Sequence, residues 1–311
     1  MPSREVFQYI AEKSGEKIAE FFLCRWCGEE YPVFHKEQVF LQKQGFSVSD
    51  LCFDCRLRSM FLWRNERKLY WRKSDKSGKK ILSMFHPEYT GKVYDYDEWD
   101  REEGFGHMGK PVDGDVLTSY YELLQEIPKS GTDIFRSNEN IWYCNRAGYL
   151  KNAYYSFACF QDNEDIYFSY VSTGSKDIYN SSNTYGSQLV AESVQVFDSY
   201  GVFFSDEIVN SKYIWFSYDM RDCEECIFCH NQVGKKYMIQ NTQYPKEQYE
   251  SMKAELQKQM STSTGRKELE KRYELLKQQS IKKALNHINA EKAYGDGLQD
   301  SKDVIYGFGL Q

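Results

Sequence analysis

Four cysteines in the first fifth of the chain have the spacing of a closed metal site. Cys24 and Cys27 form one Cys-x2-Cys pair, and Cys52 and Cys55 form a second pair after 24 intervening residues. Each pair can form a tight turn that directs two thiolates at one ion, and two such turns complete a tetrahedron. Gly28 follows the first pair, where such a turn commonly requires a positive φ. We therefore predict one structural Zn²⁺, with no open coordination position for catalysis.

The residues between these pairs resemble the probable zinc-ribbon family of bacterial proteins. The family pattern is C-x2-C-G, E-Q-x-F, K-G-F and C-x2-C-R. This sequence meets it at residues 24–28, 37–40, 44–46 and 52–56, although Gln44 stands where the pattern has Lys. The resemblance is confined to residues 24–56, and it implies zinc binding but no activity.

The segment that follows the second pair is strongly basic. Residues 56–80 hold ten Lys and Arg residues against Glu66 and Asp75. We interpret the segment as a basic helix that contacts the phosphates of DNA or RNA, with interspersed aromatic residues to stack on bases. Alternatively, the helix packs its apolar residues on the ribbon and its charges are solvated or dock on acidic residues of the same chain. The candidate nucleic-acid-binding residues are Arg56, Arg58, Arg64, Arg67, Lys68, Arg72 and Lys73.

Charge is segregated along the chain. The net charge is +5 over residues 1–80, −15 over residues 81–231 and +4 over residues 232–311, which argues against one uniform nucleic-acid-binding surface. There is no run of 18 apolar residues and no signal peptide, so we expect no membrane partner and a cytoplasmic location. In that compartment the nine cysteines are metal ligands or buried thiols rather than disulfides.

A repeat occupies the middle of the chain. From Asp133 the sequence divides into nine blocks, all of twelve residues except one of thirteen. An Ile or Val stands three places before the end of most blocks, and an aromatic residue usually follows it. Such short runs separated by turn residues predict strands that stack in parallel, a β-solenoid with coils of 12 or 24 residues. The last residues of the blocks are Cys144, Ser156, Ser169, Ser181, Ser193, Ser205, Ser217, Cys229 and Asn241.

The other five cysteines fall inside this repeat. Cys223, Cys226 and Cys229 have a spacing that resembles part of an iron–sulfur motif, but the fourth cysteine and the proline of that motif are missing. Neighbouring blocks fill the same columns with Ser, Ile or Val. We therefore interpret these three cysteines, together with Cys144 and Cys159, as inward-facing residues of the solenoid rather than as metal ligands.

Acidic residues on the predicted turns and surfaces leave another alternative open. Polysaccharide-cleaving β-helices place such residues on one face of a sheet, so a carbohydrate-binding or carbohydrate-active β-helix is one interpretation. A solubilising acidic surface is the simpler interpretation. The residues concerned are Asp162, Glu164, Asp165, Asp206, Asp219, Asp222, Glu224 and Glu225.

We expect four parts along the chain. Residues 1–80 form the zinc ribbon with its basic helix, residues 81–132 a connector that includes an N-terminal cap, residues 133–244 the solenoid, and residues 245–311 a helical hairpin with a strand-like tail. Two ends of the solenoid then have to be covered, because an exposed sheet edge invites pairing with other chains.

Within the connector, strands are expected around residues 81–85 and 92–94. A helix over residues 116–126 is expected to cover the first coil. Apolar residues at helical spacing predict two C-terminal helices, over residues 245–260 and 266–292, which either cap the far end or bind a partner. The tail, residues 301–311, resembles the start of a further coil.

The complete layout resembles a family of uncharacterised proteins from candidate-phyla bacteria. In this pattern a ribbon is followed by repeats rich in Asn, Ser, Cys and aromatic residues. The repeats end in a motif that here comprises Lys235 or Lys236, Tyr237, Ile239, Asn241, Tyr244, Lys246, Glu247 and Tyr249. The resemblance supports the fold and implies no activity.

Together these observations predict a mainly β protein without catalytic residues: an N-terminal zinc ribbon, a parallel β-solenoid on a 12-residue repeat, and C-terminal amphipathic helices. The leading hypothesis is a zinc-containing binding or scaffold protein that contacts nucleic acid through residues 56–80. One alternative is a protein-interaction solenoid with a purely structural ribbon, which binds a protein through the solenoid or the C-terminal helices. The other alternative is the carbohydrate-directed β-helix.

Overall fold

The computed structural model describes residues 3–62, 65–102, 109, 111–112, 114–135 and 137–308. By its internal contacts the chain divides into two units, residues 1–64 with 282–311, and residues 65–281. Arg64, one of the candidate nucleic-acid-binding residues, lies outside the described residues. No helix in the described part of the chain is both long enough and apolar enough to span a membrane.

The first unit contains a small antiparallel hairpin with three short helices. Gly15, with a φ of 68°, ends the first helix, whose Phe7 and Ile10 are buried with Phe34 of the hairpin. A second cluster of buried side chains gathers around Tyr31 and the cysteines. The elements are α1 (Arg4–Ser14), β1 (Ile18–Leu23), β2 (Glu30–Phe34), α2 (His35–Lys43) and α3 (Phe53–Phe61).

The C-terminal tail adds four short strands to the first unit. They are β25 (His287–Ile288), β26 (Tyr294–Asp296), β27 (Leu298–Gln299) and β28 (Ile305–Phe308). β25 pairs with β27 and β26 with β28, in both cases in parallel. Parallel pairing is that of successive solenoid coils, which the sequence predicts for residues 301–311. β28 lies in those residues, but it pairs with β26 and not with a strand of the solenoid.

The basic segment after the second cysteine pair is not one helix. α3 ends at Phe61, and β3 (Tyr70–Lys73) pairs in antiparallel fashion with β4 (Lys80–Ser83). The predicted helix over residues 56–80 is therefore wrong beyond Phe61. Gly78 in the intervening turn has a φ of 73°, a conformation that a right-handed helix excludes, and the strand pair buries Ile81 and Ser83. The expected boundary at residue 80 divides this hairpin.

The connector contains the predicted strands and helix, but the helix does not cover the first coil as expected. Strands β4 and β5 (Val93–Tyr94) and helix α5 (Val116–Glu126) lie where the sequence predicts two strands and a helix. No residue of α5 is buried, however, and hydrogen bonds link the first coil to the start of the β3–β4 segment instead. The Tyr143 hydroxyl donates to the Leu69 carbonyl at 3.1 Å, and the Asn145 amide donates to the Glu66 carbonyl at 3.2 Å. The connector also contains α4 (Tyr96–Asp100) and β6 (Lys129–Ser130).

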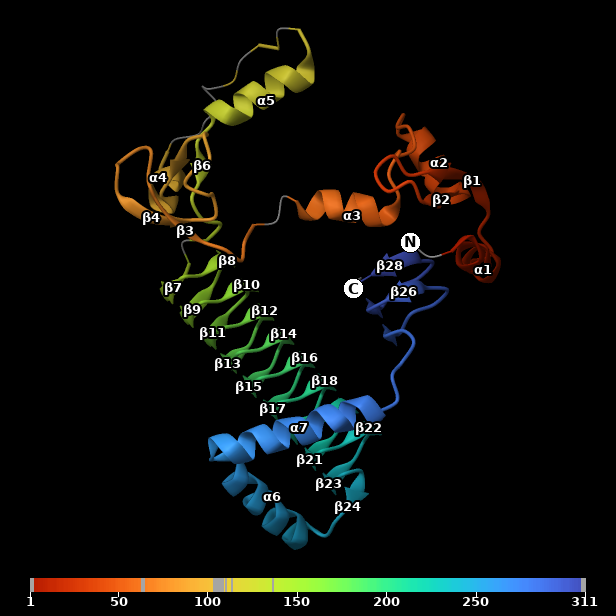
Figure 1. Cartoon of the computed structure of the whole chain (residues 1–311), viewed down its shortest axis with the longest axis vertical. Coiled ribbons are helices and arrows are strands. Elements are labelled where there is room, and N and C mark those ends of the chain that lie inside the picture. Colours follow the sequence, from red (N-terminus) through yellow and green to blue (C-terminus); the bar gives the residue numbers. More distant parts are fainter. Residues whose placement is uncertain are drawn as a thin grey trace. The chain divides into compact units, whose positions relative to one another are not determined.

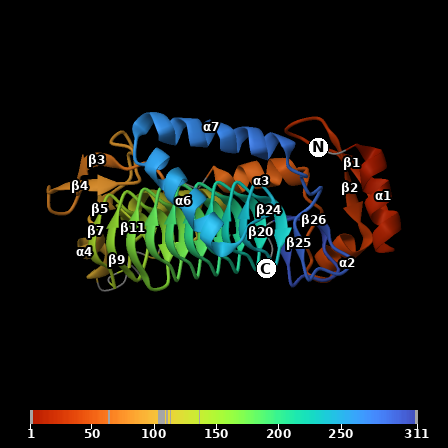
Figure 2. The ribbon, with the colours of Figure 1, turned by 90° about the horizontal axis from the view of Figure 1, so that it is seen from below.

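The predicted parallel β-solenoid is confirmed. Successive strands alternate between two parallel sheets, and each strand pairs with the one two places further along the chain (Figure 1; Figure 2). Ile166 pairs with Ile178, and Ile178 with Val190, so the coil has 12 residues. One sheet contains β8 (Asn145–Ala147), β10 (Phe157–Phe160), β12 (Tyr170–Thr173), β14 (Ser182–Tyr185), β16 (Val194–Phe197), β18 (Asp206–Val209), β20 (Tyr218–Arg221) and β22 (His230–Val233).

The other sheet closes at its far end with an antiparallel strand, β24, which pairs with β23. An antiparallel partner ends the parallel stack and covers its last edge. The strands of this sheet are β7 (Glu139–Trp142), β9 (Leu150–Tyr154), β11 (Asn163–Tyr167), β13 (Lys176–Tyr179), β15 (Gln188–Ala191), β17 (Tyr200–Phe203), β19 (Lys212–Trp215), β21 (Glu224–Ile227), β23 (Lys236–Ile239) and β24 (Thr242–Gln243).

A period of three residues lies within each coil. Every third residue from Ser175 to Ser187 is buried, and in much of the repeat one residue in three has a positive φ, as at Asp177 and Asn180. Gly, Asn and Asp are frequent at these positive-φ positions because they adopt this conformation most readily. The strands are therefore short, and each coil contains two of them.

The inward serines form hydrogen-bonded ladders along the solenoid. The Ser193 N–H donates to the Ser181 Oγ at 3.2 Å, and the Ser205 N–H donates to the Ser193 Oγ at 3.1 Å. Cysteine continues the same ladder, since the Cys229 N–H donates to the Ser217 Oγ at 3.0 Å. The predicted inward-facing role is confirmed for the five cysteines of the repeat, all of which are buried: Cys144, Cys159, Cys223, Cys226 and Cys229.

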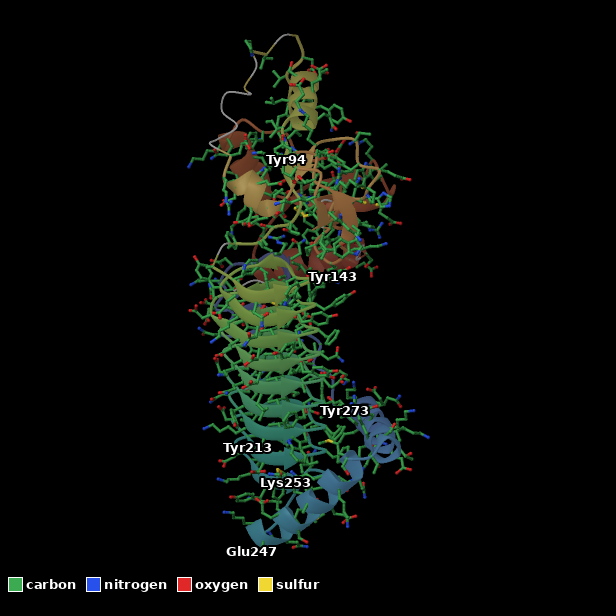
Figure 3. The ribbon with its side chains drawn as sticks, turned by 90° about the vertical axis from the view of Figure 1, so that its left-hand side faces the viewer. Tyr94, Tyr143, Tyr213, Glu247, Lys253 and Tyr273 are labelled. Atoms are coloured by element: carbon green, nitrogen blue, oxygen red, sulfur yellow. The ribbon has the colours of Figure 1, made fainter. Side chains whose placement is uncertain are left out.

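The two C-terminal helices, α6 (Lys246–Met260) and α7 (Ser263–Gln279), lie against the side of the later coils. Figure 3 shows Tyr273 between α7 and the solenoid, where its hydroxyl donates to the Ser217 carbonyl at 2.9 Å. The prediction that the second helix extends to residue 292 is wrong beyond Gln279. The Asn231 side chain binds both the N–H and the carbonyl of Ile281, at 3.1 and 3.0 Å, and holds the chain in a non-helical path.

Candidate metal centre

The first cysteine pair lies in the turn between β1 and β2. The N–H of Cys24 donates to the Glu29 carbonyl at 2.9 Å, and the N–H of Gly28 donates to the Cys24 carbonyl at 2.9 Å. Gly28 has a φ of 73°, as the sequence predicts for this turn. The turn places the side chains of Cys24 and Cys27 on the same side as the second pair.

The second cysteine pair lies at the start of α3. Cys52 is the N-cap residue, and Cys55 is in the first turn of the helix, where it is buried. The N–H of Arg25 donates to the Asp50 carbonyl at 3.0 Å, which fixes this segment beside the first turn. The two sequence-predicted pairs are therefore brought together by a hairpin turn and a helix N-terminus.

The four sulfur atoms fit a tetrahedral metal ion. All four Sγ atoms lie within 4.8 Å of one another, and the Cys27 and Cys52 Sγ atoms are 3.7 Å apart. Zn–S bonds of about 2.3 Å in a tetrahedron place sulfur atoms about 3.8 Å apart. The Sγ of Cys24, Cys52 and Cys55 belong to buried residues, whereas Cys27 is exposed at the edge of the site. The site can hold one metal ion with four thiolate ligands and no open position for a substrate.

Without a metal the four thiols do not all ionise. Burial, together with hydrogen bonds to the neighbouring thiols, raises the pKa of Cys55 to about 12. Burial acts in the same sense on Cys24, but hydrogen bonds from the backbone N–H groups of Cys52, Cys27 and Trp26 outweigh it and lower its pKa to about 6. Four thiolates in this space require a cation, so metal binding releases protons and strengthens as the pH rises.

The candidate nucleic-acid-binding residues are spread over several elements. Arg56 and Arg58 belong to α3 and the first unit, whereas Arg67, Lys68, Arg72 and Lys73 belong to the second unit around β3. Some of them already have partners. Arg56 pairs with Glu37 at 3.2 Å, the Arg67 guanidinium lies 3.7 Å from the centre of the Tyr170 ring, and Arg72 pairs with Asp75 at 3.0 Å.

Most of the acidic residues of the repeat have a structural partner. Glu164 lies 3.0 Å from Lys176, Glu224 lies 2.8 Å from Lys236, and Asp222 accepts a hydrogen bond from Asn210. The hydrogen bond from Lys176 lowers the pKa of Glu164. Within the part of the chain that the structure describes, no group of three or more Cys, His, Asp or Glu other than the four N-terminal cysteines has the geometry of a metal site.

A comparison with known proteins adds no further assignment: no family model, no curated protein and no solved structure matches this chain. The resemblance to the zinc-ribbon pattern therefore stays a prediction. The ion pair between Arg56 and Glu37 gives that pattern a physical basis, because these residues are the Arg of C-x2-C-R and the Glu of E-Q-x-F.

Proposed function

We propose that this chain is a non-catalytic interaction scaffold, in which the aromatic outer face of the first coils of the solenoid binds a partner protein. The observation that supports the proposal is a contrast along one face. In the later coils the protein's own helices α6 and α7 cover the aromatic columns, whereas in the earlier coils the same columns are exposed.

The columns follow the strand register, although Ala191 separates the aromatic residues of the earlier coils from Phe203. Tyr154 pairs with Tyr167, and Tyr167 pairs with Tyr179, in the sheet that later contains Trp215. Tyr154 and Tyr179 are 45% and 47% exposed, whereas Trp215, against the helices, is 6% exposed. Phe168, in the neighbouring column, is 48% exposed, and its counterparts Phe216 and Phe228 are buried. An exposed row of large aromatic side chains is typical of a protein-binding surface.

The contacts of α6 and α7 indicate the chemistry of the partner. Arg266 of α7 lies 2.9 Å from Glu192, and Lys277 lies 3.2 Å from Asp206, while the apolar side of the helix buries Leu269. The exposed half also combines aromatic rings with acidic groups, as where the Tyr167 hydroxyl donates to Asp165. The partner that fits this face is an amphipathic helix with an apolar stripe between Lys or Arg residues.

Site-specific photocrosslinking in the source cells tests this proposal. A photoreactive phenylalanine at Tyr167 is expected to crosslink to one defined polypeptide, and the purified polypeptide is expected to bind at least tenfold more weakly to the Tyr167→Ser variant. Val233, 63% exposed on the other sheet, is the matched control position. Equal crosslinking from both positions, or an unchanged affinity of Tyr167→Ser, would contradict the proposal.

For the cysteine site we propose that the resident ion is Zn²⁺ with a structural role. Four thiolates in a closed tetrahedron favour zinc among the abundant divalent ions and leave it no catalytic position. Such thiolates persist in a reducing compartment, so we place the protein in the cytoplasm. Elemental analysis of purified protein is expected to return about one zinc and no iron per chain. Iron, or a second zinc, would contradict this assignment and the interpretation of Cys223, Cys226 and Cys229.

Nucleic-acid binding is the second candidate function, and the β3–β4 hairpin favours it. Trp71 is 58% exposed, and the Lys80 Nζ lies 4.5 Å from the centre of its ring. Lys73 and Lys80 face each other across the strand pair, an arrangement of like charges that an anion would stabilise. An electrophoretic mobility assay with single- and double-stranded DNA and RNA at low salt tests it. The absence of a shift, or an equal shift with Trp71→Ala and Lys73→Glu combined, would contradict this candidate.

A further inference from the structure

The hairpin β3–β4 repeats the register of the hairpin β1–β2. Leu23 pairs with Glu30 in the first hairpin, and Lys73 pairs with Lys80 in the second, so the paired positions correspond at an offset of fifty residues. The three pairs that precede these along β1 and β3 keep the same offset. In Figure 1 each hairpin can be followed as two short strands joined by a turn.

The turns of the two hairpins also agree in backbone geometry. Gly28 and Gly78 both have a φ of 73°. The N–H of Gly28 donates to the Cys24 carbonyl at 2.9 Å, and the N–H of Gly78 donates to the Ser74 carbonyl at 2.9 Å. Ser74 and Ser77 therefore occupy the positions of the first cysteine pair.

The agreement extends to the second cysteine pair. The Arg25 N–H donates to the Asp50 carbonyl at 3.0 Å, and the Asp75 N–H donates to the Val93 carbonyl at 2.9 Å. In both cases the donor directly follows the first residue of the pair, and the acceptor lies two residues before a helix N-cap. The N-cap residues are Cys52, with φ −65° and ψ 165°, and Asp95, with φ −57° and ψ 149°. Three residues later, Glu98 stands where the first module has Cys55.

The side chains at these positions form a hydrogen-bonded centre. Ser74, only 2% exposed, donates its hydroxyl to the Glu98 carboxylate, and Ser77 donates to the same group. The N–H of Asp95 also donates to this carboxylate, at 3.3 Å. The hydrogen bond from Ser74, followed by that from Ser77, lowers the pKa of Glu98, so the carboxylate is charged at neutral pH. A carboxylate that accepts hydrogen bonds from Ser74, Ser77 and the Asp95 N–H thus stands where the first module can hold a cation surrounded by thiolates.

We call residues 18–61, the hairpin and helix that carry the four cysteines, the first knuckle. We propose that residues 70–100 form a second knuckle with the same architecture, in which hydrogen bonds to Glu98 replace the metal ion. The four positions Ser74, Ser77, Asp95 and Glu98 then constitute a latent metal site, meaning a site with the backbone geometry for a tetrahedral ion but without the ligands. Four thiolates at these positions are expected to bind Zn²⁺ or Co²⁺ as the native cysteines do.

The second knuckle has a defined role in the second unit. The Leu69 carbonyl beside it accepts a hydrogen bond from Tyr143 of the first coil, and the N–H of Met84 after β4 donates to the Gly131 carbonyl at 2.8 Å. The entry to the solenoid is therefore attached to a module whose fold requires neither metal nor reduced thiols. The scaffold is therefore expected to stay folded under conditions that remove a metal ion from the first module.

Cobalt titration of a four-cysteine variant tests the latent site. The variant Ser74→Cys, Ser77→Cys, Asp95→Cys and Glu98→Cys is expected to bind two Co²⁺ per chain instead of one, with the intense visible bands of tetrahedral thiolate coordination. The matched control, Lys73→Cys, Lys76→Cys, Asp97→Cys and Asp100→Cys, also introduces two Cys-x2-Cys pairs, but outside the aligned positions, and is expected to bind one. Two Co²⁺ in both variants, or one in both with the native circular dichroism retained, would overturn the proposal.

A second variant keeps the proposal testable if the four-cysteine chain does not fold. Glu98→Gln preserves the shape of the side chain but removes its charge, which weakens the hydrogen bonds from Ser74 and Ser77. Amide hydrogen exchange in β3 and β4 is expected to accelerate about tenfold or more, since hydrogen bonds to charged groups are this strong. Asp97→Asn, on the exposed side of α4, is the control. Equal exchange in the two variants would show that Glu98 does not replace a metal.

Discussion

The two knuckles reach the same backbone geometry with opposite chemistry at their centres. In the first, three of the six residues of the buried cluster are cysteines of the metal site: Cys24, Tyr31, Val33, Leu51, Cys52 and Cys55. In the second, the corresponding centre is a carboxylate with hydroxyl donors, and the module is attached to the solenoid. Strand register, a left-handed glycine and a helix N-cap therefore define the knuckle. A metal ion bound by the four thiolates would supply the stability that a small isolated core lacks.

Serine and cysteine also replace one another at equivalent positions of the solenoid. Its ladders use Ser and Cys in equivalent positions, as at Ser217 and Cys229, and the cysteine there has no metal-site geometry. Cysteine is thus positioned to bind a metal ion in the first knuckle and is a small buried side chain in the repeat. The surrounding geometry, more than the residue type, decides which role it takes.

The largest effect is expected from Cys55→Ser. Loss of one thiolate removes most of a binding free energy on the order of 10 kcal/mol, which exceeds what so small a core can replace. Native mass spectrometry is expected to show loss of the metal, and limited proteolysis is expected to cut between residues 18 and 62. Residues 65–281 are expected to resist proteolysis as before. A protected first hairpin without metal would contradict the contrast between the knuckles.

Acid is expected to separate the two knuckles. The thiols of the first must lose protons to bind metal, so its metal affinity falls steadily from pH 7 towards pH 5. The pKa of Glu98 in the folded protein lies below its ordinary value of 4.5, so its stabilising effect is fully present above pH 4.5. That effect is lost only as the pH falls through the lowered pKa. Hydrogen exchange measured at pH 7, 6 and 5 is expected to show loss of protection in β1–β2 and unchanged relative protection in β3–β4.

The turn glycines are expected to have equal effects, because both knuckles require the same backbone. No atom lies within 4 Å of a Cβ added at Gly28 or Gly78, so the cost of alanine comes from the positive φ alone. We expect about 1–2 kcal/mol at each position. For Gly28→Ala this appears as a metal affinity about tenfold weaker, and for Gly78→Ala as a lower free energy of unfolding in urea. Free-energy costs of the two substitutions that differ by more than about 2 kcal/mol would contradict the equivalence of the two turns.

The smallest effect is expected from Cys229→Ser. Its column contains Ser205 and Ser217, and a hydroxyl can make the hydrogen bonds that the thiol makes to the Ile227 carbonyl and from the Asn241 N–H. The free energy of unfolding is expected to change by less than about 1 kcal/mol. The metal content of the protein is expected not to change. A lost metal equivalent would show that the cysteines of the repeat are ligands.

Sequence patterns predicted the parts of this structure whose chemistry is explicit in residue types. The two Cys-x2-Cys pairs indicated the metal site, and the columns of Ser, Ile and aromatic residues indicated the solenoid. The coil length stayed open between 12 and 24 residues, because a repeat in the sequence does not show how many blocks complete one turn. The strand pairing of Ile166 with Ile178 decides it.

The second knuckle could not be recognised from the sequence by the same means. Ser74, Ser77, Asp95 and Glu98 have no ligand signature, and the Lys and Arg residues around β3 resemble a basic helix. Only the register of β3 and β4 and the matching φ of Gly28 and Gly78 reveal the correspondence. The end of α7 was equally inaccessible, since it depends on a hydrogen bond from Asn231 to a residue fifty positions later.

Hydrogen–deuterium exchange of the full chain with and without a zinc chelator tests the central claim most directly. Chelation is expected to expose the amides of β1, β2 and α3 to rapid exchange, while those of β3, β4 and the solenoid keep their protection. Loss of protection in both hairpins, or in neither, would contradict the claim that one knuckle depends on metal and the other does not.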